Sequence, residues 1–201
     1  MRNISIYART YYVRLSVAAF LLELKGEIYP VGNLSIFVFE GPWINLKDFL
    51  AMTECTSKRI LIIAKEETID FLSAILKADK ISYACIDTAL THLKQIIKTF
   101  IQHPTPPISN QITPTFFLQT REWCIISLYL QGKSNHYISM AMKRSAKQIN
   151  NLKRYTMKKT GVFSDAALVN YWRIITHWSH LIVPESEVNR AIKNHTKGLA
   201  R

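Results

Sequence analysis

Residues 143–162 read KRSAKQINNLKRYTMKKTGV, and they contain seven Lys or Arg but no Asp or Glu. Apolar residues are sparse in this stretch: Ala146, Ile149, Leu152 and Met157. Such a segment is either a solvated basic helix or a helix that lies in a groove of nucleic acid. The sequence on either side of it favours the second interpretation.

Positive charge is concentrated in the part of the chain that contains this segment. The 201 residues carry a net charge of +12. From Thr115 onward there are 14 Lys or Arg against 4 Asp or Glu, a net +10, whereas residues 1–114 hold 12 against 10, a net +2. This asymmetry is typical of a phosphate-binding module joined to another domain. The alternative, a cationic surface that only keeps the protein soluble, would not require such concentration.

A proline-rich segment divides the chain where the charge balance changes. Residues 103–115 read HPTPPISNQITPT and contain four prolines, which is typical of a stiff, extended linker. We therefore predict an α/β domain at residues 1–102, a linker at 103–114, a basic helical domain at 115–183 and a C-terminal tail at 184–201.

Short apolar runs alternate with helix-like stretches in residues 1–102. Gly26 can end the first of these helices, and Thr88 can cap the last. The alternation favours an α/β fold, a parallel sheet with helices on both faces. The predicted strands cover residues 4–8, 27–31, 34–41, 58–65 and 80–86, and the predicted helices cover 12–25, 46–53, 67–79 and 88–102.

The residues after the linker form a pattern of four helices. Gly132 can end the first helix and Gly161 the third. Only the residues KRS, 143–145, separate the second helix from the third. A helix, a tight turn and a basic helix form the helix-turn-helix pattern, in which the second helix enters the major groove. Each helix has a hydroxyl residue that can cap its N-terminus: Thr120, Ser134, Ser145 and Ser164.

The spacing of several motifs resembles the LuxR/FixJ-type DNA-binding domain over about residues 115–176. The matching motifs are Leu118-x-Thr120-Arg121-Glu122, Gln131-Gly132-x-Ser134-Asn135, Ile138-Ser139, Ser145-x-Lys147-x-Ile149 and Lys158-Lys159-x-Gly161-Val162. The resemblance implies an all-α four-helix domain whose third helix reads DNA. It also implies that the fourth helix, which starts at Ser164-Asp165, forms a dimer. One departure is Arg144, which stands where the family usually has an apolar residue.

The third predicted helix carries side chains suited to base edges on one face. Asn150, Asn151 and Arg154 are adjacent or three to four residues apart, so they share that face. Asn can make a bidentate pair with adenine, and Arg can do so with guanine. We therefore predict that these three residues read bases, while Ile149, Leu152 and Met157 face the first two helices.

Other residues of this helix are predicted to bind the DNA backbone. Ser145 and Lys147 lie at its N-terminus, where backbone N–H groups and the helix dipole favour phosphate. Lys153, Lys158 and Lys159 can reach flanking phosphates. For any single lysine a solvated helix face is the alternative, but that alternative explains the whole set less well.

Residues 1–102 resemble the receiver domain that precedes this DNA-binding domain in the family that includes FixJ, NarL and RcsB. A working receiver needs an acid pair after its first strand, an Asp after its third and a Lys after its fifth. Here the first predicted strand ends in YART, the third ends near Glu40, and Ile86 or Asp87 stands in place of the Lys.

The resemblance thus implies a degenerate, receiver-like (flavodoxin-like) domain that is not phosphorylated, similar to the RcsA and BglJ type of auxiliary regulator. Glu40 is either a permanent mimic of the charged acceptor or an ordinary acid at a strand end.

The sequence therefore predicts a transcription regulator that binds double-stranded DNA without phosphorylation, as a homodimer or as a heterodimer with a response regulator. An alternative is an interaction protein, an anti-activator that captures a partner regulator and has little DNA binding of its own. In that case Trp172, Ile175 and Trp178 would form an apolar seam on the fourth helix.

Other classes of protein are disfavoured. The histidines show no triad or metal-ligand spacing, and Cys55, Cys85 and Cys124 show no zinc pattern, so we expect no enzyme, metal or cofactor. No signal peptide is evident, and no apolar run approaches the roughly 20 residues of a membrane helix. We expect a cytoplasmic protein with reduced thiols that does not enter the membrane.

Overall fold

The computed structural model describes residues 4–24, 33–102, 112–114 and 118–180. The chain divides into two compact units, Met1–Thr113 and Pro114–Arg201.

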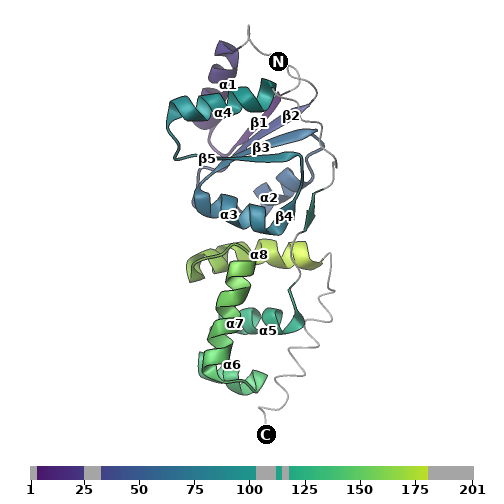
Figure 1. Cartoon of the computed structure of the whole chain (residues 1–201), viewed down its shortest axis with the longest axis vertical. Helices are drawn as coiled ribbons and strands as arrows, with labels where there is room; N and C mark the ends of the chain where they lie inside the picture. The colour runs from purple at the N-terminus through teal and green to yellow at the C-terminus, as the bar shows by residue number, and fades with distance from the viewer. Residues whose placement is uncertain (1–3, 25–32, 103–111, 115–117, 181–201) are drawn as a thin grey trace. The chain divides into compact units, whose positions relative to one another are not determined.

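The first unit is built on a parallel sheet of four described strands in the order β1-β2-β3-β5. Four helices alternate with the strands, and Figure 1 shows α1 and α4 on one face of the sheet and α2 and α3 on the other. The predicted α/β fold is therefore confirmed. The strands are β1 (Ile4–Ala8), β2 (Leu34–Val38), β3 (Arg59–Ala64) and β5 (Ile81–Cys85), and the helices are α1 (Tyr11–Glu23), α2 (Leu46–Thr53), α3 (Glu66–Ile75) and α4 (Leu90–Gln102).

The two central strands form the core of this unit. Strand β2 is buried along its whole length, and β3 is buried from Ile60 onward, because strands between two helical layers need apolar side chains on both faces. On one face Ile36, Val38 and Ile63 pack with residues of α1 and α4. Strand β1 has a partner on one side only among the described strands, and its Tyr7 is 44% exposed. The strand predicted at residues 4–8 is therefore present, but one of its faces is exposed.

Several predicted boundaries differ from the structure. The helix predicted at 67–79 ends at Ile75, because Leu76 has extended dihedral angles and starts the two-residue strand β4 (Leu76–Lys77). Helix α4 begins at Leu90, and the Ala89 carbonyl accepts its first hydrogen bond, so Thr88 does not occupy the capping position. The strand predicted at 27–31 and the helix end at Gly26 lie outside the described residues.

The end of the predicted linker contains regular structure. Thr113–Pro114 form the short strand β6, which pairs with β4 in a two-stranded sheet. Proline suits such a place because an edge strand does not need its missing N–H group. The remainder of the predicted linker, residues 103–111, lies outside the described part of the chain.

The second unit consists of four described helices, as predicted: α5 (Thr120–Leu130), α6 (Asn135–Met142), α7 (Ala146–Lys159) and α8 (Asp165–His180). The side-chain hydroxyls of Ser134, Ser145 and Ser164 accept hydrogen bonds from backbone N–H groups in the first turns of α6, α7 and α8, so these three predicted caps are confirmed. The cap predicted at Thr120 is wrong. Gln119 caps α5, and its N–H donates to the Glu122 carboxylate at 2.6 Å.

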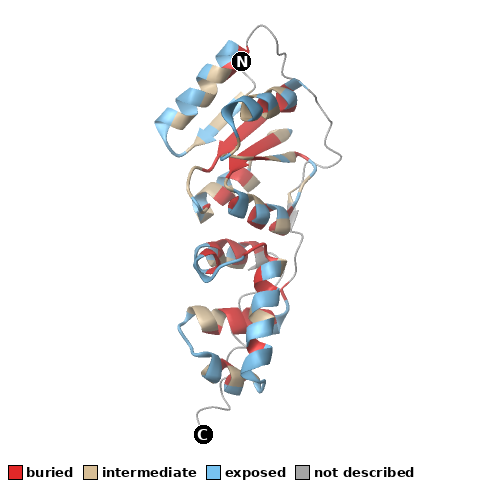
Figure 2. Cartoon of the chain, turned by 60° about the vertical axis from the view of Figure 1, so that its left-hand side comes forward, coloured by how far each residue is buried: buried red, intermediate tan, exposed pale blue. Residues whose placement is uncertain are grey.

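The interior of the second unit is apolar, and Figure 2 shows the buried face of each helix turned towards its neighbours. Ile125, Leu128, Ile138, Ala141 and Ile149 form one buried cluster that joins α5, α6 and α7. Two residues of the predicted apolar seam on α8 belong to the interior, since Ile175 is 1% and Trp178 is 7% exposed. Trp172 is half-buried, and its ring lies 4.6 Å from that of Trp123. The seam is therefore mostly core, which corrects that expectation.

The described helices do not include one with the length and the hydropathy that are needed to cross a lipid bilayer.

Candidate nucleic-acid interface

The basic segment forms α7, and local sequence fixes both of its ends. At the N-terminus Ser145 and Gln148 form a reciprocal capping box, with hydrogen bonds of 3.1 and 3.3 Å. At the C-terminus Gly161 adopts a left-handed conformation with φ of 66°, and the Val162 N–H donates to the Met157 carbonyl. Helix α7 is therefore a defined rod of 14 residues.

One side of α7 faces the interior of the unit. Ile149 and Met157 are buried, and Leu152 is half-buried against the cluster formed with α5 and α6. This confirms the predicted inward-facing set. These contacts determine which side of the helix is left in solvent.

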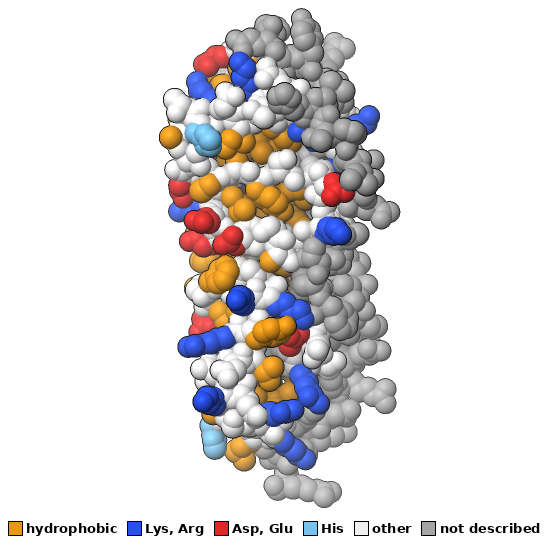
Figure 3. Space-filling view, in the orientation of Figure 1, with side chains coloured by type: hydrophobic (Ala, Val, Ile, Leu, Met, Phe, Trp, Pro, Cys, Tyr) orange, Lys and Arg blue, Asp and Glu red, His pale blue; other side chains and the backbone are white. Residues whose placement is uncertain are grey.

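The opposite side of α7 is polar and exposed. Lys147, Asn151, Arg154 and Lys158 follow one another at spacings of four, three and four residues, so they form one stripe, with Asn150 beside it. All five side chains are exposed, and within the described residues none of them has a hydrogen-bond or ion-pair partner. In Figure 3, Lys and Arg outnumber Asp and Glu over the helices of this unit. The stripe therefore offers both positive charge and amide groups to a ligand.

Lys153, which is predicted to bind phosphate, has partners inside the unit. Its ammonium lies 2.8 Å from the Asp165 carboxylate and 3.6 Å from the centre of the Tyr129 ring. The Tyr129 hydroxyl donates to the same carboxylate at 2.7 Å. This group joins α7 to α5 and α8, so Lys153 supports the orientation of α7.

The charges in this group stabilise one another. The hydrogen bonds from Lys153 and then Tyr129 lower the pKa of Asp165 from its ordinary value. Burial lowers the pKa of Lys153, but the hydrogen bonds and charges of Asp165 and Tyr129 together outweigh burial, so the pKa is raised.

We expect Asp165→Asn to destabilise the protein mildly and in a pH-dependent way. Because the folded-state pKa of Asp165 is depressed, its contribution is present above the pKa of the unfolded chain and is lost as pH falls through the folded-state pKa. Asp165 is 54% exposed, so the loss at pH 7 should not exceed about 1 kcal/mol. Urea unfolding at pH 7 and at acidic pH measures the loss in free energy of unfolding, and Asp79→Asn, at an exposed aspartate, is the control. If Asp165→Asn lowered the free energy of unfolding as much at acidic pH as at pH 7, the loss would not come from the ionised Asp165 carboxylate.

Lys159 is also held inside the unit. Its ammonium lies 3.2 Å from the carboxylate of Glu122, whose side chain is only 4% exposed. A buried carboxylate without a cation would be strongly destabilising, so Lys159 has a structural task. Of the three lysines predicted to reach flanking phosphates, only Lys158 is both exposed and unpaired in the described chain.

Three further cations near α7 are absent from the predicted set. Arg121 on α5 and Lys143 and Arg144 in the turn before α7 are exposed, and they line a hollow together with Asn151. The Lys-Arg pair within a three-residue turn is the sequence signal that could have identified two of them.

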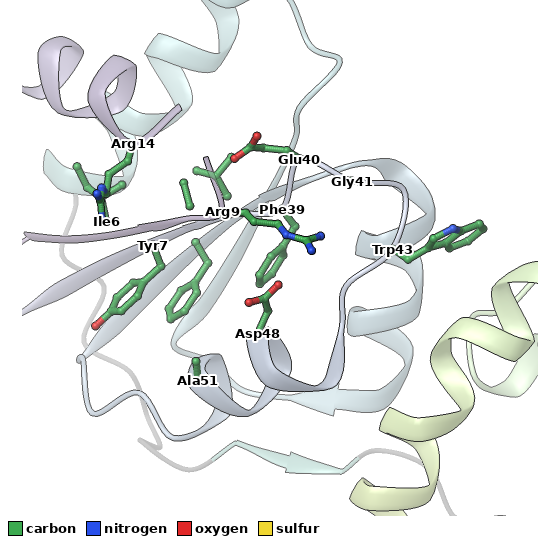
Figure 4. A pocket seen from close by; sticks show the side chains of 13 residues that line it. Ile6, Tyr7, Arg9, Arg14, Phe39, Glu40, Gly41, Trp43, Asp48 and Ala51 are labelled. Atoms are coloured by element: carbon green, nitrogen blue, oxygen red, sulfur yellow. The ribbon is translucent and has the colours of Figure 1, made fainter. Parts of the chain in front are cut away.

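A pocket lies at the carboxyl ends of strands β1 and β2 in the first unit. Thr10 donates a hydrogen bond to each carboxylate oxygen of Glu40, from its backbone N–H at 3.0 Å and from its hydroxyl at 2.6 Å. Figure 4 shows Arg9, Glu40 and Asp48 along the wall of one pocket at this edge. No three His, Cys, Asp or Glu side chains of the described residues are grouped so that they could hold a metal ion.

The second unit matches a known protein family. Residues 117–172 match the family of bacterial regulatory proteins called the luxR family. The chain therefore contains a LuxR-family helix-turn-helix DNA-binding domain, as its motifs indicated. No curated protein sequence matches the chain.

Solved structures share the folds of both units at low sequence identity. One structure of two RcsB dimers bound to two parallel DNAs has a TM-score of 0.56 and 18% identity, over 85% of this chain and 97% of that chain. An RcsB–DNA complex has a TM-score of 0.54, with the same identity and coverage. RcsB from Salmonella enterica serovar Typhimurium bound to promoter rprA with BeF3⁻ has a TM-score of 0.54 and 17% identity, over 86% and 98% of the chains. The likeness establishes a receiver-like unit followed by a helical LuxR-type unit.

Proposed function

We propose, from the LuxR-family helix-turn-helix domain at residues 117–172, that this chain is a sequence-specific DNA-binding transcription regulator of the cytoplasm. The observation that carries the proposal is the exposed stripe on α7. Its opposite side is fixed in the core by Ile149 and Met157, so the stripe is presented to solvent in one orientation. We propose no catalytic role.

In this proposal the residues of α7 have different tasks. Asn150, Asn151 and Arg154 read base edges in the major groove, since amides pair with adenine and guanidinium with guanine. Lys147 and Lys158, at opposite ends of the stripe, bind phosphates. The backbone N–H groups and the dipole at the helix N-terminus, beside Ser145, contribute to phosphate binding as well. The two sets differ in what they contribute, because phosphate contacts fix position and base contacts fix sequence.

We further propose that this activity does not depend on phosphorylation. The first strand is followed by Arg9 and Thr10, where a working receiver would have its acids. Glu40 is engaged on both oxygens by Thr10, and Ile86 and Asp87 follow the last strand. These features support a degenerate receiver of the RcsA and BglJ type, in which Glu40 joins two strand ends.

A dimer, with itself or with a response regulator, fits the surface of α1. This helix exposes Tyr12, Leu15 and Leu22, which are 79%, 51% and 56% exposed and lie on one side of the helix. A second copy or a response regulator that covered these side chains would remove apolar surface from water, which supports a dimer.

The alternative function, an anti-activator that captures a partner regulator, draws its support from the same exposed residues of α1. It predicts retention of a protein partner with little retention of DNA.

The proposed function is tested by DNA binding with and without a phosphoryl donor. We expect the full chain to bind a selected DNA target with equal affinity, within about twofold, before and after incubation with acetyl phosphate and Mg²⁺. Fluorescence anisotropy measures the affinity, and intact-mass spectrometry measures phosphate incorporation. Tenfold tighter binding together with an added phosphoryl group would contradict independence from phosphorylation. Failure to bind any DNA while a partner protein is retained would favour the anti-activator.

A further inference from the structure

Three consecutive helices of the second unit end with the same backbone cap. In each cap one residue adopts left-handed dihedral angles, and the N–H of the next residue donates to a carbonyl five residues earlier, which defines a Schellman motif. The left-handed residues are Gly132 after α5 with φ of 76°, Lys143 after α6 with φ of 52° and Gly161 after α7 with φ of 66°. The returning hydrogen bonds join Lys133 to Leu128 at 3.1 Å, Arg144 to Ser139 at 2.9 Å and Val162 to Met157 at 2.8 Å.

The cap of α6 departs from its two neighbours at the left-handed position. Glycine is favoured there because a Cβ atom crowds the following backbone. Two of the three caps have glycine, but α6 has Lys143, which is the one described non-glycine residue with positive φ. The chain therefore keeps a lysine where glycine would be more stable.

The next position of the same cap departs as well. The residue after the left-handed one commonly packs an apolar side chain back onto its helix. In the cap of α7 this residue is Val162, which is 1% exposed. In the caps of α5 and α6 it is an exposed cation, Lys133 and Arg144. Of the three caps, only that of α6 breaks the local preference at both positions, and both of its residues are cations. Such breaks are expected at functional sites.

Both cations face the DNA-reading side of the unit. Lys143 and Arg144 line a hollow of about 570 Å³, and Arg121 from the first turn of α5 lines it too. Gln148 and Asn151 of α7 complete the polar wall. Among the described residues that line the hollow, Glu122 is the only acid, and it is neutralised by Lys159. The three cations have no ion-pair partner within the described residues. The hollow is therefore electropositive and open to an anion.

We propose that Arg121, Lys143 and Arg144 form a clamp for a backbone phosphate of the DNA that α7 reads. The clamp rests on the proposed function, and the phosphate is one adjacent to the base that Asn151 contacts, because Asn151 shares the hollow. Guanidinium groups bind phosphate oxygens in bidentate fashion, so two of them around one hollow suit a phosphodiester. Such a contact carries no sequence information and positions α7 in the groove.

The test uses the full chain with two variants that restore the preferred residue of the cap, Lys143→Gly and Arg144→Ile. Each variant removes one positive charge and restores the residue type that is preferred at its position of the cap. We expect each to raise Tm by about 2–4 °C. We also expect each to weaken DNA binding by about 5- to 10-fold, equally on target and non-target DNA. The slope of log affinity against log salt should fall by about one for each charge removed.

A control variant removes a charge from the equivalent cap of α5. Lys133 follows Gly132 in that cap and does not line the hollow. Lys133→Gln should leave affinity within about twofold of the parent.

The outcomes separate the clamp from the function on which it rests. If the parent binds DNA and the two variants bind equally well, the clamp is wrong and the proposed function stands. If the variants lose both affinity and thermal stability, the loss is structural, which also overturns the clamp. If the parent itself shows no salt-dependent binding, the proposed function fails.

Discussion

We expect Lys159→Met to lower the free energy of unfolding of the second unit by about 3 kcal/mol. Glu122 is buried, and within the described residues it accepts one hydrogen bond besides that from Lys159, from the Gln119 N–H. Removal of the ammonium leaves a buried carboxylate without a counter-charge, and the desolvation of that carboxylate is then uncompensated. Urea unfolding of the full chain, followed by tryptophan fluorescence, measures the effect, since Trp123, Trp172 and Trp178 lie in this unit.

The adjacent lysine supplies a matched control. Lys158 is exposed and unpaired within the described residues, so Lys158→Met should change stability by no more than about 0.5 kcal/mol. The double variant Glu122→Gln with Lys159→Met should lose less than Lys159→Met alone, because it removes both charges. Equal losses for Lys158→Met and Lys159→Met would show that the buried pair does not support α7.

The second large effect concerns DNA binding. We expect Asn151→Ala and Arg154→Ala each to lower affinity for the target by 10-fold or more, which corresponds to about 1–3 kcal/mol for a bidentate base contact. Both side chains are exposed and unpaired in the described chain, so the stability of the protein should be almost unchanged. Fluorescence anisotropy on target and non-target DNA measures affinity, and thermal unfolding checks stability.

Two comparisons identify the nature of the loss. Arg154→Ala should weaken target binding more than non-target binding, whereas Lys158→Met should weaken both alike because it removes a phosphate contact. Lys47→Ala, an exposed lysine of the first unit, controls for the change of net charge. If Arg154→Ala weakened both DNAs equally, Arg154 would be a phosphate contact and not a reader of bases.

Features of the fold that depend on neighbouring residues could be predicted from the sequence. Ser134, Ser145 and Ser164 cap their helices because a hydroxyl beside the first turn satisfies N–H groups locally. The inward side of α7 follows from the spacing of Ile149 and Met157. The buried strands β2 and β3 follow from uninterrupted apolar runs. In these cases local chemistry and tertiary packing agree.

Features that depend on distant partners could not be predicted in this way. Lys153 and Lys159 look like other basic residues of α7, but they pair with Asp165 and with Glu122, which is 37 residues away. In the same way, Ile175 and Trp178 resemble a surface seam until the packing of α8 shows them to be core. The left-handed conformation of Lys143 could not be predicted, because the residue lies in a run of basic residues where the sequence contains no glycine.

Helix α7 is proposed to read bases through its exposed stripe, and selection of binding sites from a random DNA pool is the sharpest test of that role. The parent chain and Arg154→Ala are taken through the same selection, and the recovered sequences are compared. We expect a defined motif for the parent, and for the variant the loss of preference at one base pair of each half-site. Recovery of the same motif with undiminished preference by the variant would contradict it.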